Sequence, residues 1–162
     1  MKDIVIRKAR NKDVDDIRNI LLLNHKEDYE EWPSIYIPPD IQKGPSKKEI
    51  RKNISNKNNI ILMACNNNNI IGIIVSELSE GSAPLKKKEY GLIKRLYVIK
   101  NQRERGIATK LIKKTKKHYN RKGVDEVRLH VFGHNKQALK LYTKLGFTYL
   151  VSLMTDCIHI RR

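Results

Sequence analysis

The sequence predicts an α/β protein in which a mixed sheet of about seven strands carries about four helices on its two faces. Three observations support this fold class. The 162 residues are the usual size of one compact domain. Apolar residues alternate in some segments and recur at helical spacing in others. The two kinds of segment follow one another as βα(α)ββ, then βαβα, then ββ. We therefore expect a single domain over residues 1–162.

The N-terminal part starts as a strand and continues as a helix. Ile4 and Ile6 alternate with charged residues, and Asp13 precedes apolar residues that recur at helical spacing. From Asn24 to Pro45 this periodicity is lost among prolines and charges. We expect an irregular segment or a broken helix there, and its aromatic residues suggest a binding lid.

A short helix and a hairpin are expected next. Ser46 and Glu49 have the spacing of a capping box, which predicts a short basic helix that ends near Asn53. Two β-branched runs, residues 60–65 and 70–78, are separated by asparagines, which tolerate tight turns. These runs predict a β-hairpin.

The C-terminal part alternates between strands and helices. The helices carry apolar residues on one stripe only, so each is expected to cover a face of the sheet. The expected inward stripe of the first of these helices is Ala108, Leu111, Ile112, Thr115 and Tyr119. The expected elements are a strand at 89–98, a helix at 103–121, a strand at 126–132, a helix through 138–145 that ends at Gly146, and two short closing strands within 148–160.

The chain is strongly basic. Its 34 Lys and Arg residues against 17 Asp and Glu residues give a formal charge of +17 at pH 7. Such a field attracts polyanions and repels cationic partners, although a drift in composition explains the excess equally well. The lysine runs are not interleaved with aromatic residues, so nucleic-acid binding has no support beyond charge.

The two cysteines and the lack of long apolar runs indicate whether a metal site is expected and in which cell compartment the protein works. Cys65 and Cys157 lie in apolar stretches without the spacing of a zinc site or a disulfide framework, so we expect buried small hydrophobic residues and no metal. No apolar run reaches the roughly 20 residues that span a bilayer, and the N-terminus does not resemble a secretion signal. We expect a soluble cytoplasmic protein with no membrane partner, and the sequence does not exclude the nucleus.

The segment that carries chemistry joins a strand end to a helix start. Backbone N–H groups at such a helix start can receive an anion, assisted by the positive end of the helix dipole. Small residues at positions 106 and 108 let a pyrophosphate approach the backbone, although a packing constraint alone also explains a glycine there. The strand ends at Leu96-Tyr97-Val98, and a short loop leads into Arg103-Glu104-Arg105-Gly106-Ile107-Ala108.

Two spaced motifs make the chain resemble the GNAT acetyltransferases. Arg103, Gly106 and Ala108 match the R/Q-x-x-G-x-G/A phosphate loop of that family, and residues 135–147 resemble its N-x-x-A-x-x-x-Y-x-x-x-G-F segment. The resemblance covers nearly the whole chain and is weakest within residues 24–45. It implies acetyl-CoA as co-substrate, with the pyrophosphate in the loop and the pantetheine arm along the strand end, where the fourth and fifth strands part. The implied cofactor-binding residues are Leu96, Tyr97, Val98, Arg103, Glu104, Arg105, Gly106, Ile107, Ala108, Thr109, Asn135, Tyr142 and Lys144.

The resemblance also implies direct transfer of an acetyl group from a thioester to an amine, a reaction that needs no metal. Tyr142 is the expected general acid, because its hydroxyl would lie close to the CoA sulfur and protonate the leaving thiolate. The alternative is that Tyr142 only packs. Many relatives carry acidic residues on the strand before the loop, and this chain has Lys94 and Arg95 there. This difference argues against a carboxylate base at that position and against polyamine acceptors.

His130 is the expected substitute for that carboxylate base. It lies twelve residues before Tyr142, where it resembles the base position of some amino-terminal protein acetyltransferases. A neutral imidazole can accept a proton at cellular pH. A purely structural histidine is the competing interpretation, and Glu89, Tyr90 or a water chain are the alternative bases.

Two classes of function remain. The first is an N-acetyltransferase whose acceptor is a small primary amine, such as a phosphorylated amino sugar, or a protein amino terminus. A cationic histone tail or spermidine is disfavoured, because no acidic strip is apparent to receive it. The second is a catalytically weak CoA-binding or nucleic-acid-associated module on the same fold. The exposed closing strands are compatible with a homodimer.

Overall fold

A computed structural model describes residues 4–41, 43–67, 69–81 and 88–151 of the chain. The chain divides into two compact units, Met1–His130 and Val131–Arg162, and each is described here by itself. The single domain expected from the sequence stays a prediction. Residues 148–151, where the first closing strand was expected, form no strand, and the rest of that segment, Cys157 included, lies outside the described residues.

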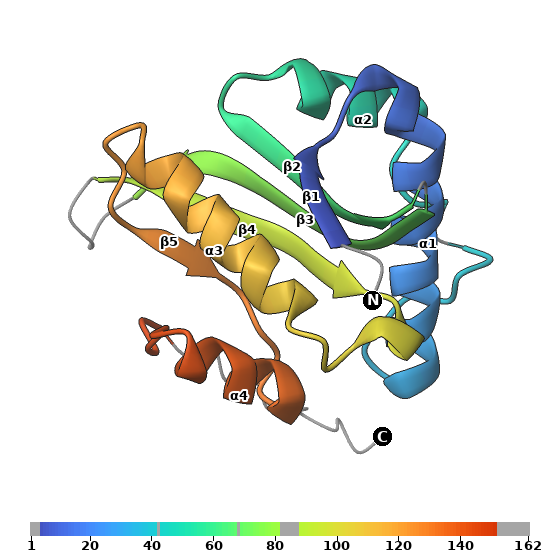
Figure 1. Ribbon diagram of the computed structural model, residues 1–162. Coiled ribbons are helices and arrows are strands. Elements are labelled where there is room, and N and C mark those ends of the chain that lie inside the picture. Colours follow the sequence, from blue (N-terminus) through green and yellow to red (C-terminus); the bar gives the residue numbers. More distant parts are fainter. Residues whose placement is uncertain (1–3, 42, 68, 82–87, 152–162) are drawn as a thin grey trace, which may run out of the picture. The chain divides into compact units, whose positions relative to one another are not determined.

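The first unit is built on a mixed sheet (Figure 1). Neighbouring strands along the chain are neighbours in the sheet, the first three pairs being antiparallel and the last parallel. The mixed α/β fold class is confirmed, but the described residues contain five strands and not about seven. These strands are β1 (Ile4–Lys8), β2 (Asn59–Asn66), β3 (Asn69–Glu80), β4 (Glu89–Val98) and β5 (Val127–Leu129).

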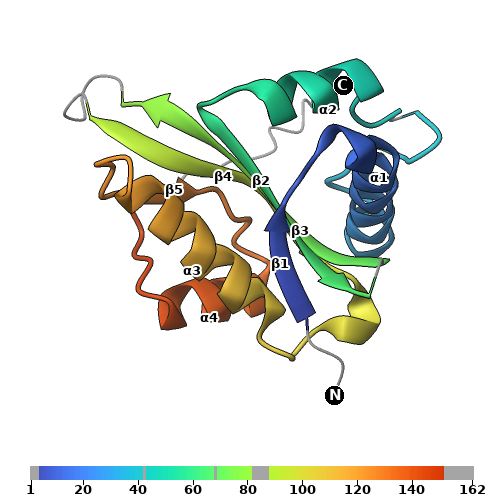
Figure 2. The same cartoon turned by 45° about the horizontal axis from the view of Figure 1, so that its top comes forward.

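Helices cover both faces of this sheet. Figure 2 shows α1 and α2 on one side of it and α3 on the other. In the described chain no helix combines the length and the apolar character needed to cross a membrane. The helices are α1 (Val14–Glu31), α2 (Lys47–Ser55), α3 (Ile107–Asn120) and, in the second unit, α4 (Lys136–Lys144), with 3-10 turns η1 (Asn11–Asp13) and η2 (Lys100–Gln102).

Several element boundaries differ from those expected. Helix α1 continues through residues 24–31, where the loss of apolar periodicity predicts an irregular segment or a broken helix. Helix α3 begins at Ile107 and not at Arg103, because the residues before it form the loop. Strand β5 has three residues and stops before His130. The capping box of α2 is confirmed, since the Ser46 hydroxyl accepts from the Glu49 N–H at 3.2 Å.

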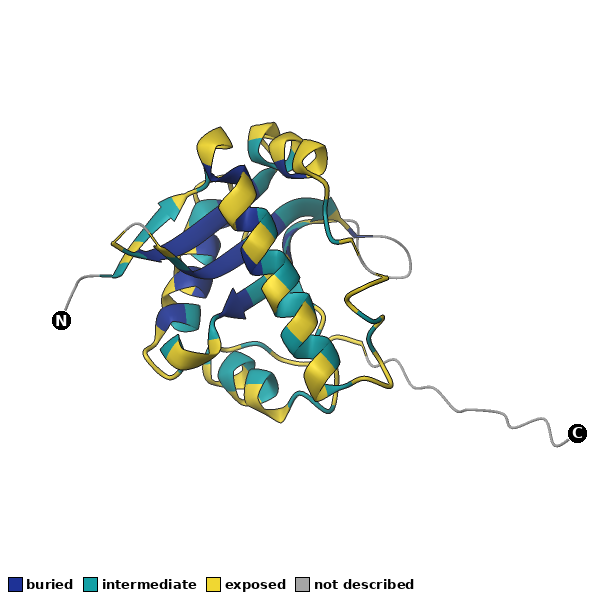
Figure 3. Ribbon diagram, turned by 90° about the vertical axis from the view of Figure 1, so that its right-hand side faces the viewer, coloured by how far each residue is buried: buried dark blue, intermediate teal, exposed yellow. Residues whose placement is uncertain are grey.

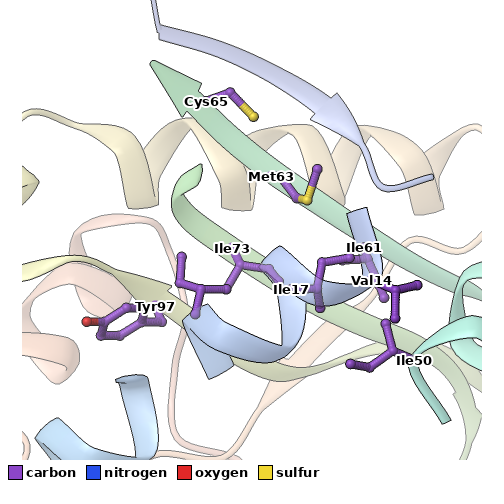
Figure 4. Packing of buried hydrophobic residues seen from close by; sticks show 9 residues of the cluster. Val14, Ile17, Ile50, Ile61, Met63, Cys65, Ile73 and Tyr97 are labelled. Carbon is purple, nitrogen blue, oxygen red and sulfur yellow. The ribbon is translucent and has the colours of Figure 1, made fainter. Parts of the chain in front are cut away.

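The α1 and α2 side of the sheet holds a continuous hydrophobic core. Figure 4 shows residues from the two helices meeting alternate residues of β2, with Tyr97 of β4 at one end. Cys65 belongs to this cluster and is buried, as expected. The members of the cluster are Val14, Ile17, Ile20, Ile50, Ile61, Met63, Cys65, Ile73 and Tyr97.

The other face of the sheet lies under α3. Leu62 and Ala64, which alternate with the first set along β2, are buried, as are the inward residues of α3. Figure 3 colours the ribbon by burial. The expected inward stripe of α3 is confirmed at four positions, whereas Ala108 is only partly buried and Ile107 is buried beside it. The confirmed residues of the stripe are Leu111, Ile112, Thr115 and Tyr119.

Candidate active site

Strands β4 and β5 pair over a short distance and then part. The parallel ladder joins Gly91 to Val127 and ends where Ile93 meets Leu129, while β4 continues to Val98. Within the described residues, no strand pairs with the last residues of β4 on that side. The backbone groups of Leu96, Tyr97 and Val98 are therefore next to an open strand edge. Their pairing with a pantetheine arm stays a prediction.

A β-bulge lies where the two strands part. Arg95 pairs with Val75 and Ile93 pairs with Ser76, so Lys94 is the extra residue in β4. A bulge breaks the alternation of a strand, and Lys94 and Arg95 are accordingly both exposed. Lys94 forms an ion pair with Glu77 of β3 at 3.2 Å. This leaves the two basic residues in different electrostatic surroundings.

The loop before α3 has an anion-receiving shape. Glu104 and Gly106 both have left-handed backbones, with φ of 64° and 72°. Gly106 is the N-cap of α3, and a Cβ at this position would meet no atom within 4 Å. Across the described chain, no protein acceptor is found for the backbone N–H groups of residues 104–109. Free N–H groups of this kind at a helix N-terminus form a concave site for a phosphate.

The Arg103 side chain turns away from the anion-receiving groups. Its Nε donates to the Val98 carbonyl at 3.0 Å, and its Nη2 donates to Oε2 of Glu27 at 2.6 Å. The guanidinium carbon lies 5.8 Å from the centre of the Tyr97 ring. In this geometry Arg103 braces the loop against β4, and direct contact of its side chain with a pyrophosphate stays a prediction.

Glu27 is a site residue that sequence reasoning missed. Its Oε1 accepts a 2.7 Å hydrogen bond from the Tyr97 hydroxyl, so one carboxylate bonds both Tyr97 and Arg103. Burial, reinforced by the bond to Glu27, raises the pKa of Tyr97 well above its ordinary value, and the phenol stays a hydrogen-bond donor. No local sequence pattern identifies Glu27 as a site residue, because its two partners lie 70 and 76 residues further along the chain.

Asp28 faces a different neighbourhood from Glu27. Its carboxylate accepts from the Asn24 amide at 2.9 Å. Burial raises the pKa of Asp28, and the nearby positive charge of Arg95 partly opposes that rise. Burial, followed by the charge of Asp28, also raises the pKa of Tyr36. Asp28, Tyr36 and Arg95 are therefore electrostatic neighbours on the α1 side of β4.

The segment after α1 folds back on that helix. Backbone bonds from Ile35 and Tyr36 to the Trp32 carbonyl make a tight turn. The Tyr36 ring then lies 6.3 Å from the rings of both Trp32 and His25, and His25 Nε2 lies 2.7 Å from the Ile37 carbonyl. The aromatic residues that suggested a lid thus flank Asp28. Their role as a lid stays a prediction.

His130 is the first residue after β5. Its neighbour Leu129 forms the last β4–β5 pair with Ile93, so His130 stands where the strands part. The imidazole is exposed, and within the described residues it has no hydrogen bond or ion pair. Glu89 and Tyr90, the alternative bases, lie at the opposite end of β4 from the open edge. The Tyr90 ring is also covered by the Arg128 guanidinium at 4.0 Å.

The remaining predicted site residues lie in the second unit. Asn135 caps α4 by accepting the Ala138 N–H at 3.0 Å, which explains the N-x-x-A spacing structurally. Gly146, with φ of 83°, ends the helix, and the Phe147 N–H bonds the Tyr142 carbonyl at 3.0 Å. Lys144 is the exposed last residue of α4.

Tyr142 is largely removed from water. Its ring meets that of Phe147 edge to face, with centroids 5.7 Å apart. Burial raises the pKa of Tyr142 to about 12. The phenol therefore remains protonated throughout the neutral range, as a proton donor must, and it is a weaker acid than an exposed tyrosine.

An open strand edge that leads to an anion-receiving loop is suited to an extended, phosphate-bearing co-substrate, as group-transfer enzymes use. The described residues contain no group of three or more His, Cys, Asp or Glu side chains that could hold a metal ion. A sequence model described as "Acetyltransferase (GNAT) family" matches residues 16–147. The chain belongs to this family, whose fold binds acetyl-CoA.

Individual proteins are similar to this chain in sequence or in fold. The N-alpha-acetyltransferase MAK3 of Arabidopsis thaliana is 34% identical over 88 residues, which are 54% of this chain and 44% of that protein. The chain therefore matches less than half of that relative. The Bacillus halodurans protein BH1408, solved as a mutant, has a TM-score of 0.84 at 17% identity, with 96% of this chain and 99% of that chain covered. An aminoglycoside acetyltransferase from an uncultured soil metagenomic sample, solved with trehalose, has a TM-score of 0.70 at 23% identity, covering 98% and 97%.

Proposed function

We propose that this acetyltransferase moves an acetyl group from acetyl-CoA to a primary amine. The observation that carries the proposal is the parting of β4 and β5 beside the loop that leads into α3. The open edge at Leu96 to Val98 offers backbone groups to the pantetheine arm. The free N–H groups around Gly106 offer a site for the pyrophosphate. The pantetheine arm and the pyrophosphate of an extended CoA molecule would then each have a binding site on the chain.

The chemistry needs one group to take a proton and one to give a proton. We assign the first role to His130, whose exposed ring stands where the strands part. The amine nitrogen attacks the thioester carbon and the C–S bond breaks. His130 takes the proton that the attacking nitrogen loses as the amide forms, and the Tyr142 hydroxyl protonates the leaving thiolate. Proton exchange with solvent then returns both side chains to their starting states. Backbone N–H groups on the open edge would stabilise the developing oxyanion.

Two acceptor classes have specific support. A small amine that carries a phosphate or carboxylate is favoured by Arg95, which is exposed beside the bulge, while Lys94 is already paired with Glu77. Asp28 would then face the ammonium group. A protein amino terminus is favoured by the similarity to an N-alpha-acetyltransferase. Both acceptors present a primary amine, and they differ in size and charge.

A thiol-release assay with acetyl-CoA tests the proposal. The acceptor panel should contain phosphorylated and neutral amino sugars, spermidine, an aminoglycoside and short peptides with free or blocked amino termini. We expect release with the phosphorylated sugars or the free peptides and none with blocked peptides. CoA binding by calorimetry is the control for folded protein. Tight CoA binding without transfer to any amine would contradict the enzyme and favour a CoA-binding module.

A further inference from the structure

Glu27 joins three separate elements of the first unit. Its side chain is 21% exposed and projects from α1, and its two oxygens bond different partners. Oε1 accepts from the Tyr97 hydroxyl at 2.7 Å, near the end of β4. Oε2 accepts from Arg103 Nη2 at 2.6 Å, at the start of the phosphate loop. Neither oxygen of this carboxylate is left to solvent alone.

Arg103 connects Glu27 to the phosphate loop. Besides its bond to Glu27, its Nε holds the Val98 carbonyl and its backbone N–H donates to the Lys100 carbonyl at 3.3 Å. The next residue, Glu104, has a left-handed backbone, which is unfavourable for a residue with a side chain. A strained backbone persists only where its surroundings hold it. The hydrogen bonds of Arg103 hold the backbone at the residue immediately before this strained position.

The hydrogen bond between Glu27 and Arg103 joins a carboxylate to a guanidinium group. A hydrogen bond between an ionised donor and an ionised acceptor is shorter and stronger than a neutral one. The Arg103 side chain is 31% exposed, so solvent screens this pair only in part. The free N–H groups of the loop do not contact Glu27 themselves. Any effect of Glu27 on an anion must therefore pass through Arg103.

We propose that Glu27 is a positioning residue that holds the acetyl-CoA loop in its binding shape through Arg103, while the Tyr97 hydroxyl holds the Glu27 carboxylate in place. The proposal rests on the proposed function, because it concerns the same co-substrate site. It makes the affinity for CoA depend on a residue of α1 that touches neither CoA nor the reacting atoms. Glu27 therefore affects the binding of the donor and leaves the chemical step nearly intact.

Calorimetric titration of CoA, without acceptor, is the primary test. The variants are Glu27→Ala, which removes both bonds, and Glu27→Gln, which keeps the shape and loses the charge. We expect the Kd for CoA to rise about tenfold in the first and by less in the second, in line with the loss of a charge-assisted bond. The KM for acetyl-CoA should rise in parallel, and kcat should change less than about twofold.

Glu30→Ala is the matched control. Glu30 lies on the same helix, is 60% exposed and, among the residues that the structure describes, forms only a long i,i+4 pair with Lys26 at 3.8 Å. Its replacement should leave CoA affinity unchanged. The double variant Glu27→Ala/Arg103→Ala should bind CoA no more weakly than Arg103→Ala alone, because both residues act through one contact.

The outcomes separate the two proposals. A folded wild-type protein that fails to bind CoA overturns the proposed function. A wild-type protein that binds CoA, with unchanged affinity in folded Glu27→Ala and Glu27→Gln, overturns the positioning role alone. If Glu27→Ala does not fold, Glu27→Gln decides, and CoA affinity equal to that of the wild type refutes the role of the charge. A fall in kcat without a change in Kd also overturns it.

Discussion

The ring of Tyr119 in α3 occupies the space that a side chain at Gly91 of β4 would need. A Cβ built on Gly91 would lie 2.3 Å from the ring, far inside van der Waals contact. The phenol oxygen of Tyr119 lies 2.9 Å from the Ser76 hydroxyl, which in turn donates to the Leu92 carbonyl at 2.8 Å. Helix α3, which presents the phosphate loop, is thus fixed to β3 and β4 at its far end.

Gly91→Ala should destabilise the protein by about 2 to 3 kcal/mol, because the fully buried Tyr119 ring cannot move away without losing the Ser76 bond. Urea unfolding measures the change. Gly133→Ala is the control, since a Cβ at that position meets nothing within 4 Å. The double variant Gly91→Ala/Tyr119→Leu should lose less stability than the sum of the single variants. A neutral Gly91→Ala variant would show that the close approach is absent in solution.

The buried carboxylate of Asp13 should make stability depend on acid pH. Asp13 is 3% exposed and accepts two bonds from Arg7, at 2.7 and 2.8 Å. The Arg7 guanidinium lowers the pKa of Asp13 below its ordinary value of 3.8. The stabilisation is therefore fully present above that value and is lost as the pH falls through the lowered pKa in the folded state.

Asp13→Asn should reduce the free energy of unfolding at pH 7 by about 2 to 3 kcal/mol, at the low end for a buried pair because Arg7 is partly exposed. Urea titrations between pH 7 and pH 2 should show the two proteins converging at low pH. Asp15→Asn, which breaks only an exposed pair with Lys47, should change little. A constant difference between wild type and Asp13→Asn at every pH would contradict the charge effect.

Local motifs predicted the parts of the site that depend on the backbone. The loop that ends at Gly106 rests on a few residues at fixed spacing, and its backbone geometry follows from that spacing. The cap at Asn135 was not predicted, although the motif that contains Asn135 and Ala138 has the spacing of such a cap. The sheet was predictable for a similar reason, because β2 and β3 read as alternating or β-branched runs. Backbone conformation of this kind depends on a few neighbouring residues, so it can be predicted directly from the sequence.

The parts that depend on distant side chains were not predictable from such patterns. The end of α1 is polar, so its apolar periodicity fades although the helix continues to Glu31. Glu27 and Asp28 therefore appeared to lie in an irregular segment. One available signal was overlooked: the adjacent charges Lys94 and Arg95 in an apolar strand indicate a bulge, since a regular strand would bury one of them.

Asp28→Asn should separate acceptor binding from donor binding. Burial raises the pKa of Asp28, so keeping its carboxylate ionised costs more free energy in the folded protein than in the unfolded chain. The variant should therefore be at least as stable as the wild type. Its KM for the acceptor amine should rise about tenfold, while its Kd for CoA stays unchanged, the reverse of Glu27→Gln. An unchanged acceptor KM would remove Asp28 from the acceptor site.

Tyr142→Phe should lower turnover about tenfold or more and leave CoA affinity nearly intact, because the ring and its contact with Phe147 remain while the proton donor is lost. Tyr149→Phe, at an exposed position of the same unit, is the matched control. With its pKa at about 12, Tyr142 should produce no step in the pH–rate profile at neutral pH. Wild-type turnover in Tyr142→Phe would leave Tyr142 with a packing role only.

His130→Ala should alter the pH dependence of the rate and not only its size. If the imidazole takes the ammonium proton, kcat/KM of the wild type must rise with increasing pH as the base loses its own proton. The variant should lose that rise and keep its CoA affinity, because the exposed ring makes no bond within the described residues. His25→Ala, whose ring is held at the Ile37 carbonyl, controls for the removal of a histidine near α1. A wild-type profile in His130→Ala would assign the proton to another group, and the same profile in Asp28→Asn would leave water as the acceptor.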